Sequence, residues 1–313
     1  MRAVFARSGS VELRDIEEPT GGDTLVRVAE AGICGSDLHM VENGMKDVAI
    51  GHEFGGWLAD GTLVAVRPTG ECGTCDPCAR GFQNACRDSW ATSYGIALNG
   101  GLADRVMVES KRIFPMGPGA RPTDAALVEP LAVSLHGVRR GNPQPGAKAV
   151  VVGAGSIGLL TVASLRAWGL EVDIVTRHPH QALAAEALGA RVIEKPASSS
   201  YMYAFDAVCN QQTVDSCISA CAPGGTVVEF GMFWTPVQMT NAMMFKEVTF
   251  VPAMAYTHHN DHDDFREAAD ILSKDPGIAD AVVTHTFGLD DAVEAFRVAA
   301  DRRSGAIKVH LAP

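Results

Sequence analysis

A chain of 313 residues, 47% hydrophobic and 20% charged, has the composition of a globular protein and is long enough for two domains. Its formal net charge of −11 disfavours nucleic acid and anionic membrane surfaces as partners. The N-terminal residues lack a basic segment followed by an apolar run, so we expect no signal peptide and a cytoplasmic location. The most apolar stretch, 149–165, contains glycines and is too short for a membrane span.

The first 130 residues carry short β-type runs broken by Gly and Pro, which predict a β-rich domain. Strands are expected at 24–33, 62–68 and 103–110. After Phe250 the periodicity is mainly helical, and the chain closes with a short apolar run. These elements are expected at 263–274, 289–304 and 306–312. We expect residues 253–313 to complete the first domain.

Between these parts, residues 131–252 alternate between strand and helix patterns at short intervals. Strands are expected at 147–155, 171–177, 191–194, 205–210 and 225–231. Helices are expected at 156–169, 180–190 and 213–222. This alternation predicts an α/β domain with a doubly wound parallel sheet of Rossmann type.

The motif GAGSIG follows the strand AKAVVV and begins an apolar helix, which is the context that a dinucleotide-binding loop requires. Gly153 permits the tight turn, Gly155 lets the backbone approach a pyrophosphate, and Gly158 allows close packing of helix on strand. Ser156 and Ile157 bring the helix N-terminus to the phosphates. The alternative is a tight turn that binds nothing.

The end of the next strand bears on the choice of cofactor. An NAD site is expected to have Asp or Glu there, to bind the ribose hydroxyls, but this chain has Thr176 followed by Arg177. A guanidinium can bind a 2′-phosphate through charge-assisted hydrogen bonds. We therefore predict NADP(H) over NAD(H), the alternative being a solvated Arg177 and an indifferent site.

Four of the eight cysteines stand in one short segment, ECGTCDPCARGFQNAC. Cytoplasmic cysteines favour metals over disulfides, and four thiolates suit a closed tetrahedral zinc site. Short cysteine spacings also suit an iron–sulfur cluster, so the spacing leaves both possibilities open. The candidate ligands are Cys72, Cys75, Cys78 and Cys86.

A second candidate metal site lies in GICGSDLH and IGHEF. Cys34, His52 and Glu53 offer sulfur, nitrogen and oxygen donors, and a catalytic zinc needs three protein ligands and one exchangeable position. From spacing alone, a buried cysteine and two surface residues explain the same pattern.

Several stretches, taken together and in order, resemble the zinc-dependent medium-chain dehydrogenase/reductase family of alcohol, sorbitol and threonine dehydrogenases. The matching stretches are GICGSDLH, GHEFGG, the four-cysteine segment, GGLADRVMV, ALVEPLAVSLHGV, VVGAGSIGLL, EALGA, APGGTVVEFG and IKVHLAP. The resemblance runs nearly end to end. It implies a GroES-like catalytic domain, a catalytic zinc and a structural zinc at the four cysteines.

Carried over by motif, Cys34 and His52 resemble the family's two constant zinc ligands. Glu53 is either a third ligand or a nearby carboxylate that can exchange onto the metal. Glu129, in VEPLA, stands where alcohol dehydrogenases have a cysteine and the polyol and sugar branch has glutamate; the alternative is a carboxylate that begins a helix.

The resemblance also implies a route for the proton. Ser36 matches the position whose hydroxyl accepts the substrate proton, and His39 matches the histidine that passes it to solvent. Asp37 resembles a carboxylate that hydrogen-bonds the zinc-bound imidazole. Lys308 either pairs with a carboxylate near the metal or is an exposed lysine.

The segment between His39 and Gly51 is shorter than the family usually has, and so is 57–71, after GHEFGG. Elsewhere, NQQT (210–213) and THHNDHDD (257–264) are interpreted as polar loops, although the first could contact a cofactor and the second a metal. Three cysteines in strand and helix patterns are interpreted as buried core residues. They are Cys209, Cys217 and Cys221.

The predicted function is a zinc-dependent oxidoreductase that transfers a hydride between NADP(H) and an alcohol, polyol or sugar or its carbonyl form. One alternative is a carbonyl or enoyl reductase that does not need the zinc at Cys34. Another is a non-catalytic NADPH-binding protein with a structural zinc only. The resemblance implies a homo-oligomer, a dimer or tetramer, with a small molecule as substrate.

Overall fold

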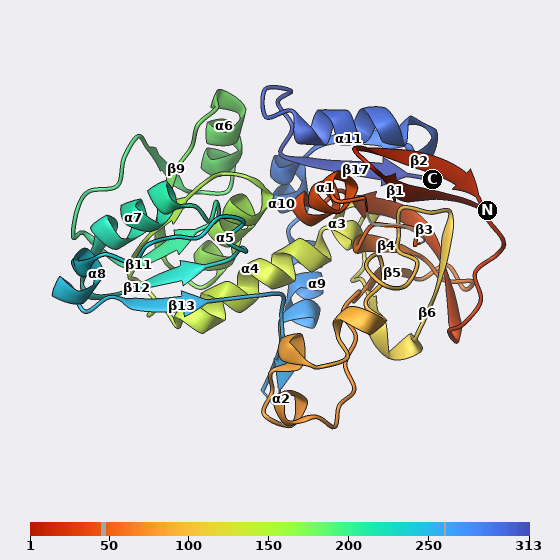
Figure 1. Cartoon of the computed structure of the whole chain (residues 1–313), viewed down its shortest axis with the longest axis horizontal. Coiled ribbons are helices and arrows are strands. Elements are labelled where there is room, and N and C mark those ends of the chain that lie inside the picture. The colour runs from red at the N-terminus through yellow and green to blue at the C-terminus, as the bar shows by residue number, and fades with distance from the viewer. Residues whose placement is uncertain (45–47, 260) are drawn as a thin grey trace. The chain divides into compact units, whose positions relative to one another are not determined.

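A computed structural model describes residues 1–44, 48–259 and 261–313 (Figure 1). The chain divides into two compact units. Unit 1 comprises Met1–Glu129 and Thr257–Pro313, and unit 2 comprises Pro130–Tyr256. The boundaries expected from the sequence, at 130/131 and 252/253, lie one and four residues from these.

Unit 1 is built on a seven-stranded sheet with the order β16-β17-β3-β4-β5-β7, in which β6 also pairs with β3. All its pairs are antiparallel except that of β16 with β17. β1 and β2 form a separate antiparallel pair, as do β14 and β15. The strands are β1 Arg2–Arg7, β2 Ser10–Asp15, β3 Thr24–Gly32, β4 Glu53–Trp57, β5 Leu63–Val66, β6 Arg105–Val108, β7 Ile113–Pro115, β14 His258–His259, β15 His262–Asp263, β16 Val283–Gly288 and β17 Lys308–Ala312.

The helices of unit 1 begin and end where the sequence supplies caps and apolar spacing. In α9, Phe265, Ala268, Ala269 and Leu272 are buried and follow the i, i+3, i+4, i+7 spacing of one helix face. The Asp263 carboxylate accepts hydrogen bonds from the first amides of α9, so the polar segment THHNDHDD supplies the cap of this helix. The helices are α1 Gly35–Glu42, α2 Asp76–Ala79, α3 Pro122–Ala126, α9 Asp264–Lys274, α10 Gly277–Val282 and α11 Ala292–Ala300; α4, Val128–Gly141, leads into unit 2.

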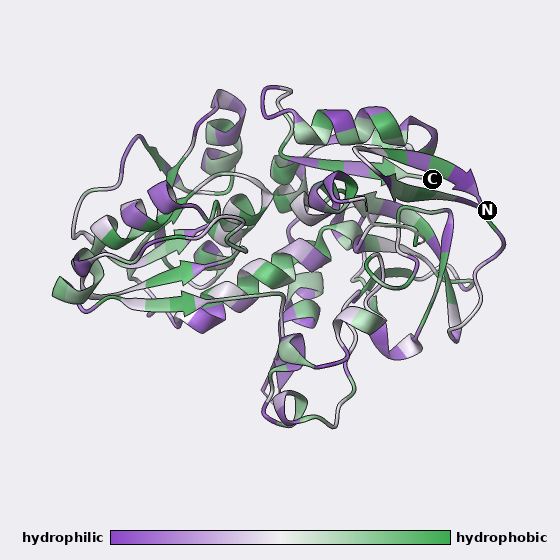
Figure 2. Ribbon diagram, in the orientation of Figure 1, coloured by the Kyte–Doolittle hydropathy of each residue, from purple (hydrophilic) through white to green (hydrophobic). Residues whose placement is uncertain are grey.

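Unit 2 contains a six-stranded parallel sheet with the order β10-β9-β8-β11-β12-β13. The strand order reverses between β8 and β11, which is the signature of the doubly wound fold. Its strands are strongly hydrophobic along their length (Figure 2), as expected where both faces of a parallel sheet are covered. The strands are β8 Lys148–Val152, β9 Glu171–Val175, β10 Arg191–Ile193, β11 Tyr201–Asp206, β12 Cys221–Glu229 and β13 Thr249–Pro252.

The helices of unit 2 follow the strands, as the sequence predicts. They are α5 Ser156–Ala167, α6 Pro179–Ala187, α7 Gln211–Ala220 and α8 Asn241–Phe245. Several strand predictions need correction. β12 begins at Cys221, where a helix was expected, and β13 was not expected. β11 begins four residues before the expected start and ends at Asp206, so Cys209 lies in a turn. The strand β16 was not expected, because its alternation of half-buried and exposed residues is short and follows a helix. Among the described residues, no helix is long and apolar enough to cross a membrane.

Candidate zinc centres and cofactor loop

Helix α1 begins directly after Cys34 and thereby fixes the position of this cysteine. The backbone N–H of Cys34 donates to the Asp37 carboxylate over 2.8 Å, while Asp37 returns a backbone hydrogen bond to the Cys34 carbonyl. A carboxylate in the first turn also interacts favourably with the helix dipole. The GICGSD motif therefore holds Cys34 at a capped helix start.

His52 immediately precedes β4 and is 8% exposed. Its Nδ1 lies 3.3 Å from the Asp37 carboxylate, and its Nε2 lies 3.3 Å from the Ser36 hydroxyl. Burial lowers the pKa of His52, but the charges of Asp37 and Cys34 outweigh burial and raise this pKa well above its usual value. Asp37 orients the ring as a carboxylate does behind a metal-bound imidazole.

Glu53 is the first residue of β4 and forms a buried ion pair with Lys308 of β17. The Lys308 ammonium lies 2.8 and 2.7 Å from the two carboxylate oxygens and donates to the Ile33 carbonyl over 3.0 Å. Lys308 and Glu53 are 3% and 1% exposed. The predicted pairing of Lys308 is confirmed, and the exposed alternative is wrong. A β-carbon at Gly32 would overlap the Glu53 carboxylate, so this glycine makes room for it.

The structure brings Cys34, His52 and Glu53 together, with one donor atom of each within 4.8 Å of the others. Thiolate, imidazole and carboxylate are zinc ligands, so the donor set fits this metal. Glu129 is 8% exposed. Burial raises its pKa to about 8, with His52 opposing the rise and Glu53 adding to it. Glu129 thus lies within electrostatic reach of the site.

His39 lies on α1 one turn after Ser36, with its side chain 38% exposed and its Nδ1 3.2 Å from the Glu42 carboxylate. It is therefore open to solvent, as its predicted role requires. Of the short segment that follows it, residues 45–47 lie outside the described residues.

The four cysteines of the ECGTCDPC loop form a second cluster, with all four sulfurs within 4.8 Å of one another. The Cys75 sulfur lies 3.5 Å from that of Cys78 and 3.8 Å from that of Cys86. Backbone amides donate to two of the sulfurs: Cys72 to Cys86 over 3.2 Å, and Cys75 to Cys72 over 3.3 Å. Such bonds favour the thiolate, and hydrogen bonds from Thr74 and from the Cys75 amide lower the pKa of Cys72 to about 6. Four sulfurs with this spacing fit a closed tetrahedral zinc site.

The segment THHNDHDD packs against this cysteine loop. The His258 Nε2 lies 2.9 Å from both oxygens of Glu71, next to Cys72 in the chain. A β-carbon at Gly81 would crowd the His259 ring. The segment thus supports the loop and caps α9, while residue 260 lies outside the described residues.

The glycine loop of unit 2 has the conformation that each glycine predicts. Gly153 has φ of 101°, in the region that favours glycine. A β-carbon at Gly158 would overlap the Gly153 carbonyl, whereas one at Gly155 would meet open space. Ser156 and Ile157 form the first turn of α5. The loop can therefore accept a phosphate at the start of this helix.

Thr176 and Arg177 follow β9 directly. Arg177 is exposed, and its backbone N–H donates to the Gln181 side chain over 3.2 Å. Its guanidinium forms no ion pair with any of the described residues, which leaves it available to an anionic ligand. By contrast, Asn210 and Gln211 serve the fold: Asn210 caps α7, and Gln211 bonds Asp215 and Gln238.

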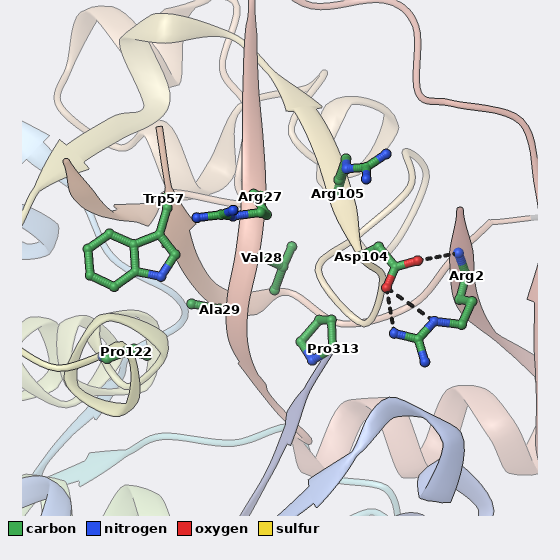
Figure 3. A pocket seen from close by; sticks show the side chains of 9 residues that line it. All are labelled: Arg2, Arg27, Val28, Ala29, Trp57, Asp104, Arg105, Pro122 and Pro313. Atoms are coloured by element: carbon green, nitrogen blue, oxygen red, sulfur yellow. Dashed lines mark hydrogen bonds and ion pairs between the residues drawn. The ribbon is translucent and has the colours of Figure 1, made fainter. Parts of the chain in front are cut away.

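Unit 1 also contains a pocket of about 540 Å³ near β3 and β6 (Figure 3). Arg27 and Trp57 line one side, and the ion pair of Arg2 with Asp104, at 2.8 Å, lines the other. None of the predicted site residues lines this pocket, so it is separate from the zinc centres.

Two protein-family descriptions match the chain. Residues 20–118 match the alcohol dehydrogenase GroES-like domain, and residues 156–274 match the zinc-binding dehydrogenase domain. The first contains Cys34, His52, Glu53 and the four-cysteine loop, and the second begins at the first turn of α5. The chain belongs to the zinc-binding medium-chain dehydrogenase family.

Curated relatives of this zinc-binding dehydrogenase extend over nearly its whole length. L-galactonate-5-dehydrogenase of Escherichia coli K12 is 29% identical over 301 residues, which cover 88% of this chain and 87% of the relative. L-idonate 5-dehydrogenase of Vitis vinifera is 29% identical over 327 residues, which cover 92% of this chain and 87% of the relative.

Solved structures show the same fold. A zinc-binding dehydrogenase from Sinorhizobium meliloti 1021, bound to NADP, has a TM-score of 0.89 at 28% identity, covering 100% of this chain and 99% of that one. L-idonate 5-dehydrogenase from Escherichia coli K-12 has a TM-score of 0.86 at 25% identity, and the match covers 100% of this chain and 97% of that one.

The dehydrogenase is therefore an enzyme that binds zinc and acts on CH–OH groups with a nicotinamide cofactor. The family membership disfavours the iron–sulfur, zinc-independent and non-catalytic alternatives. One group of residues was missed by the sequence analysis: Asp206, Cys209 and Glu229 of unit 2 also place donor atoms within 4.8 Å of one another. The available signal was a glutamate ending the apolar strand GGTVVE.

Proposed function

We propose that this chain is a zinc-dependent, NADP-preferring dehydrogenase whose substrate is a polyol, a sugar or a sugar acid. The observation that carries the proposal is the donor set of half-buried Cys34 with buried His52 and Glu53, with Glu129 in electrostatic reach. The four-cysteine loop, by contrast, offers a closed set of ligands and is assigned a structural zinc.

Cys34 and His52 are assigned as the fixed ligands of the catalytic zinc. When bound, zinc supplies a Lewis acid that lowers the pKa of a coordinated alcohol. Both Glu53 oxygens are bonded to Lys308, whereas Glu129 forms no ion pair with the described residues. Glu129 is therefore assigned as the third zinc ligand while Glu53 stays in its ion pair with Lys308. Glu53 is the carboxylate that can exchange onto the metal.

Ser36 and His39 provide a path for the proton that the alcohol loses. The Ser36 hydroxyl lies 3.3 Å from His52 Nε2, close to the donor atoms, where it can accept a proton from an alcohol oxygen. His39 stands one helical turn away with an exposed ring. It can accept the proton from Ser36 and release it to solvent.

Two observations support a polyol or sugar substrate. By its VEPLA motif, Glu129 resembles the glutamate of the polyol and sugar branch of the family, and the curated relatives include dehydrogenases of L-galactonate, L-idonate and sorbitol. These substrates share a secondary alcohol flanked by further hydroxyls. A pocket with several polar groups discriminates strongly against substrates that leave those groups unbonded.

The substrate class is tested with the purified, zinc-loaded chain by following the absorbance of the reduced nicotinamide. Sorbitol, L-idonate and L-galactonate are compared with 2-butanol and ethanol, each with NADP⁺ and NAD⁺. We expect at least one polyol or sugar acid to exceed the simple alcohols in kcat/KM by about 100-fold. Preference for a simple alcohol would refute the substrate class and leave the dehydrogenase activity in place.

The cofactor preference rests on Arg177 and on the absence of a carboxylate at 176–177, and the Sinorhizobium relative is bound to NADP. Replacing Arg177 with Ala should lower kcat/KM for NADP⁺ about tenfold and change that for NAD⁺ little. Arg140→Ala, at an exposed position on α4, is the matched control. A wild-type preference for NAD⁺ would overturn the assignment.

Homo-oligomer formation stays a prediction. Only the first three residues of the run VVEFGMF (227–233) lie on β12, which is an interior strand, and β13 is the edge strand. Met244 and Phe245 on the nearby α8 are 74% and 85% exposed. Sedimentation velocity of the wild type and of the Phe245→Ser variant would show whether two copies of the chain associate through this edge.

A further inference from the structure

A third group of potential metal ligands lies in unit 2, outside both zinc centres of unit 1. Asp206 ends β11, Cys209 lies in the turn before α7, and Glu229 ends β12. Neighbouring strands of a parallel sheet end at the same edge, so these three residues meet there. One donor atom of each lies within 4.8 Å of the other two.

The Asp206 carboxylate is held in a fixed orientation. It is fully buried, and its Oδ1 accepts hydrogen bonds from the Val208 and Cys209 amides over 2.9 and 3.0 Å. The second oxygen, Oδ2, is buried with no hydrogen-bond partner among the described residues. One oxygen is thus anchored by the backbone while the other is free to bind, as is common for carboxylates that ligate metals.

Glu229 is 2% exposed, and neither of its carboxylate oxygens accepts a hydrogen bond from a nitrogen or oxygen donor of the described residues. The Cys209 thiol is the one polar hydrogen that interacts with it among these residues. Burial and the nearby Asp206 raise its pKa to about 8. Neither carboxylate forms an ion pair with a described Lys, Arg or His. Buried carboxylates without partners are costly, and a buried charge is normally paired or bound to a metal.

Cys209 completes the group with a sulfur donor. Its backbone has φ of 65°, which is unfavourable for a residue with a β-carbon. A β-carbon at Gly231 would lie 2.5 Å from the Cys209 sulfur, so the glycine after Phe230 leaves space for the thiol. Cys209 is only partly buried, which gives an ion access from solvent.

We propose that Asp206, Cys209 and Glu229 bind a third zinc ion, with water in the fourth position. One thiolate and two carboxylates suit zinc better than calcium or magnesium, which prefer oxygen ligands only. The ligand atoms around one zinc ion lie roughly 3.2–3.8 Å from one another. The three donor atoms here lie within 4.8 Å of one another, so small side-chain movements bring them to that spacing. The ion would replace the thiol proton and connect the turns that follow β11 and β12, and it would stabilise unit 2 independently of the catalytic site.

The competing explanation is that the two carboxyl groups share a proton and bind no metal. The purified full-length chain is incubated with zinc, freed of excess by gel filtration and analysed for metal by mass spectrometry. Cys209→Ser and Glu229→Gln should each contain one zinc fewer than wild type. The matched controls are Cys217→Ala, on α7 outside the group, and Glu186→Gln, exposed on α6; both should keep the wild-type number.

Crystals grown with zinc keep the proposal testable if a variant folds poorly. Anomalous scattering at the zinc edge should show a peak between the three side chains, in addition to peaks at the two sites of unit 1. Peaks in unit 1 alone, or equal zinc contents in all variants, would overturn the third site and leave the proposed function intact. Loss of the peak at Cys34 and His52 would count against the proposed function instead.

Discussion

The two cysteine-containing sites of unit 1 are built in opposite ways. The four-cysteine loop takes all its donors from residues 72–86, and short turns and N–H···S bonds between neighbours bring the sulfurs together. The proposed catalytic site collects its donors Cys34, His52 and Glu53 from a helix start and the beginning of β4, and the proposed ligand Glu129 comes from the beginning of α4. Its geometry depends on the pairing of β3 with β4 and β17.

This difference predicts different failures. The local site should fail by losing its metal and loosening its own segment, while most of the sheet remains. The site assembled across the sheet should tolerate loss of its metal structurally, because strand pairing and the Glu53–Lys308 ion pair remain. Loss of this metal should instead appear as a loss of catalytic turnover.

The largest effect is expected for the catalytic ligands. Cys34→Ser or His52→Gln should lower kcat about 1,000-fold or more, because zinc then no longer polarises the alcohol. The zinc content should fall by one per chain, with an unchanged circular dichroism spectrum. His285→Gln, on β16, is the control and should retain full activity. Near-normal turnover in either ligand variant would place the catalytic metal elsewhere.

The next largest effect concerns the cysteine loop. Cys78→Ser should remove one zinc and lower Tm by roughly 10 °C, because metal binding at such sites contributes to folding free energy. The surviving folded enzyme should keep kcat within about fivefold. The test is metal analysis with calorimetry and steady-state rates. A variant that stays fully stable with its zinc content unchanged yet loses hydride transfer would mean that the two sites are assigned the wrong way round.

The ion pair behind the catalytic site comes third. Lys308→Met leaves the Glu53 carboxylate buried without its partner and should lower the free energy of unfolding by about 3 kcal/mol. The double variant with Glu53→Gln should recover much of this loss, since it removes the buried charge. Urea unfolding at pH 7 measures both. If the single variant were as stable as wild type, the ion pair would have no part in holding the site.

The smallest effect is expected for a polar cluster around Asp173 that is in none of the potential metal-ligand groups of the described residues. It serves as a reference for the two zinc centres. Asp173 of β9 is 3% exposed. Burial raises its pKa, but hydrogen bonds from Arg191, Tyr201 and Lys148 outweigh this and lower the pKa to about 2. Its contribution to stability is therefore present above the unfolded pKa near 3.8 and is lost as the pH falls towards 2.

Asp173→Asn should thus cost about 1–2 kcal/mol at pH 7, a figure reduced for the solvent around Lys148 and Arg191. The difference from wild type should shrink between pH 4 and pH 2. Urea unfolding across this range measures it. A difference that stays constant with pH would show that the loss comes from packing and not from the charge.

The sequence by itself determined the elements with strong periodicity and the site with short spacing. The alternation over 131–252 predicted the parallel sheet, because buried parallel strands must be apolar and crossover helices must follow them. The cysteine loop could be read from spacing because its ligands are neighbours in the chain. The glycine loop could be predicted because two of its glycines have local steric reasons, the positive φ of Gly153 and the close approach of Gly158 to the Gly153 carbonyl.

Only the tertiary structure decided what depends on residues far apart in the chain. Lys308 could be exposed or paired until β17 was seen beside β3, where its ammonium reaches Glu53 and the Ile33 carbonyl. Cys209 looked like a core residue in a strand, but β11 ends at Asp206, and the turn directs the thiol towards two buried carboxylates. Spacing in sequence reports proximity only within a few residues, whereas strand pairing brings together groups separated by hundreds of residues. The physical reason is that long-range contacts follow from packing of the whole sheet, which no local pattern encodes.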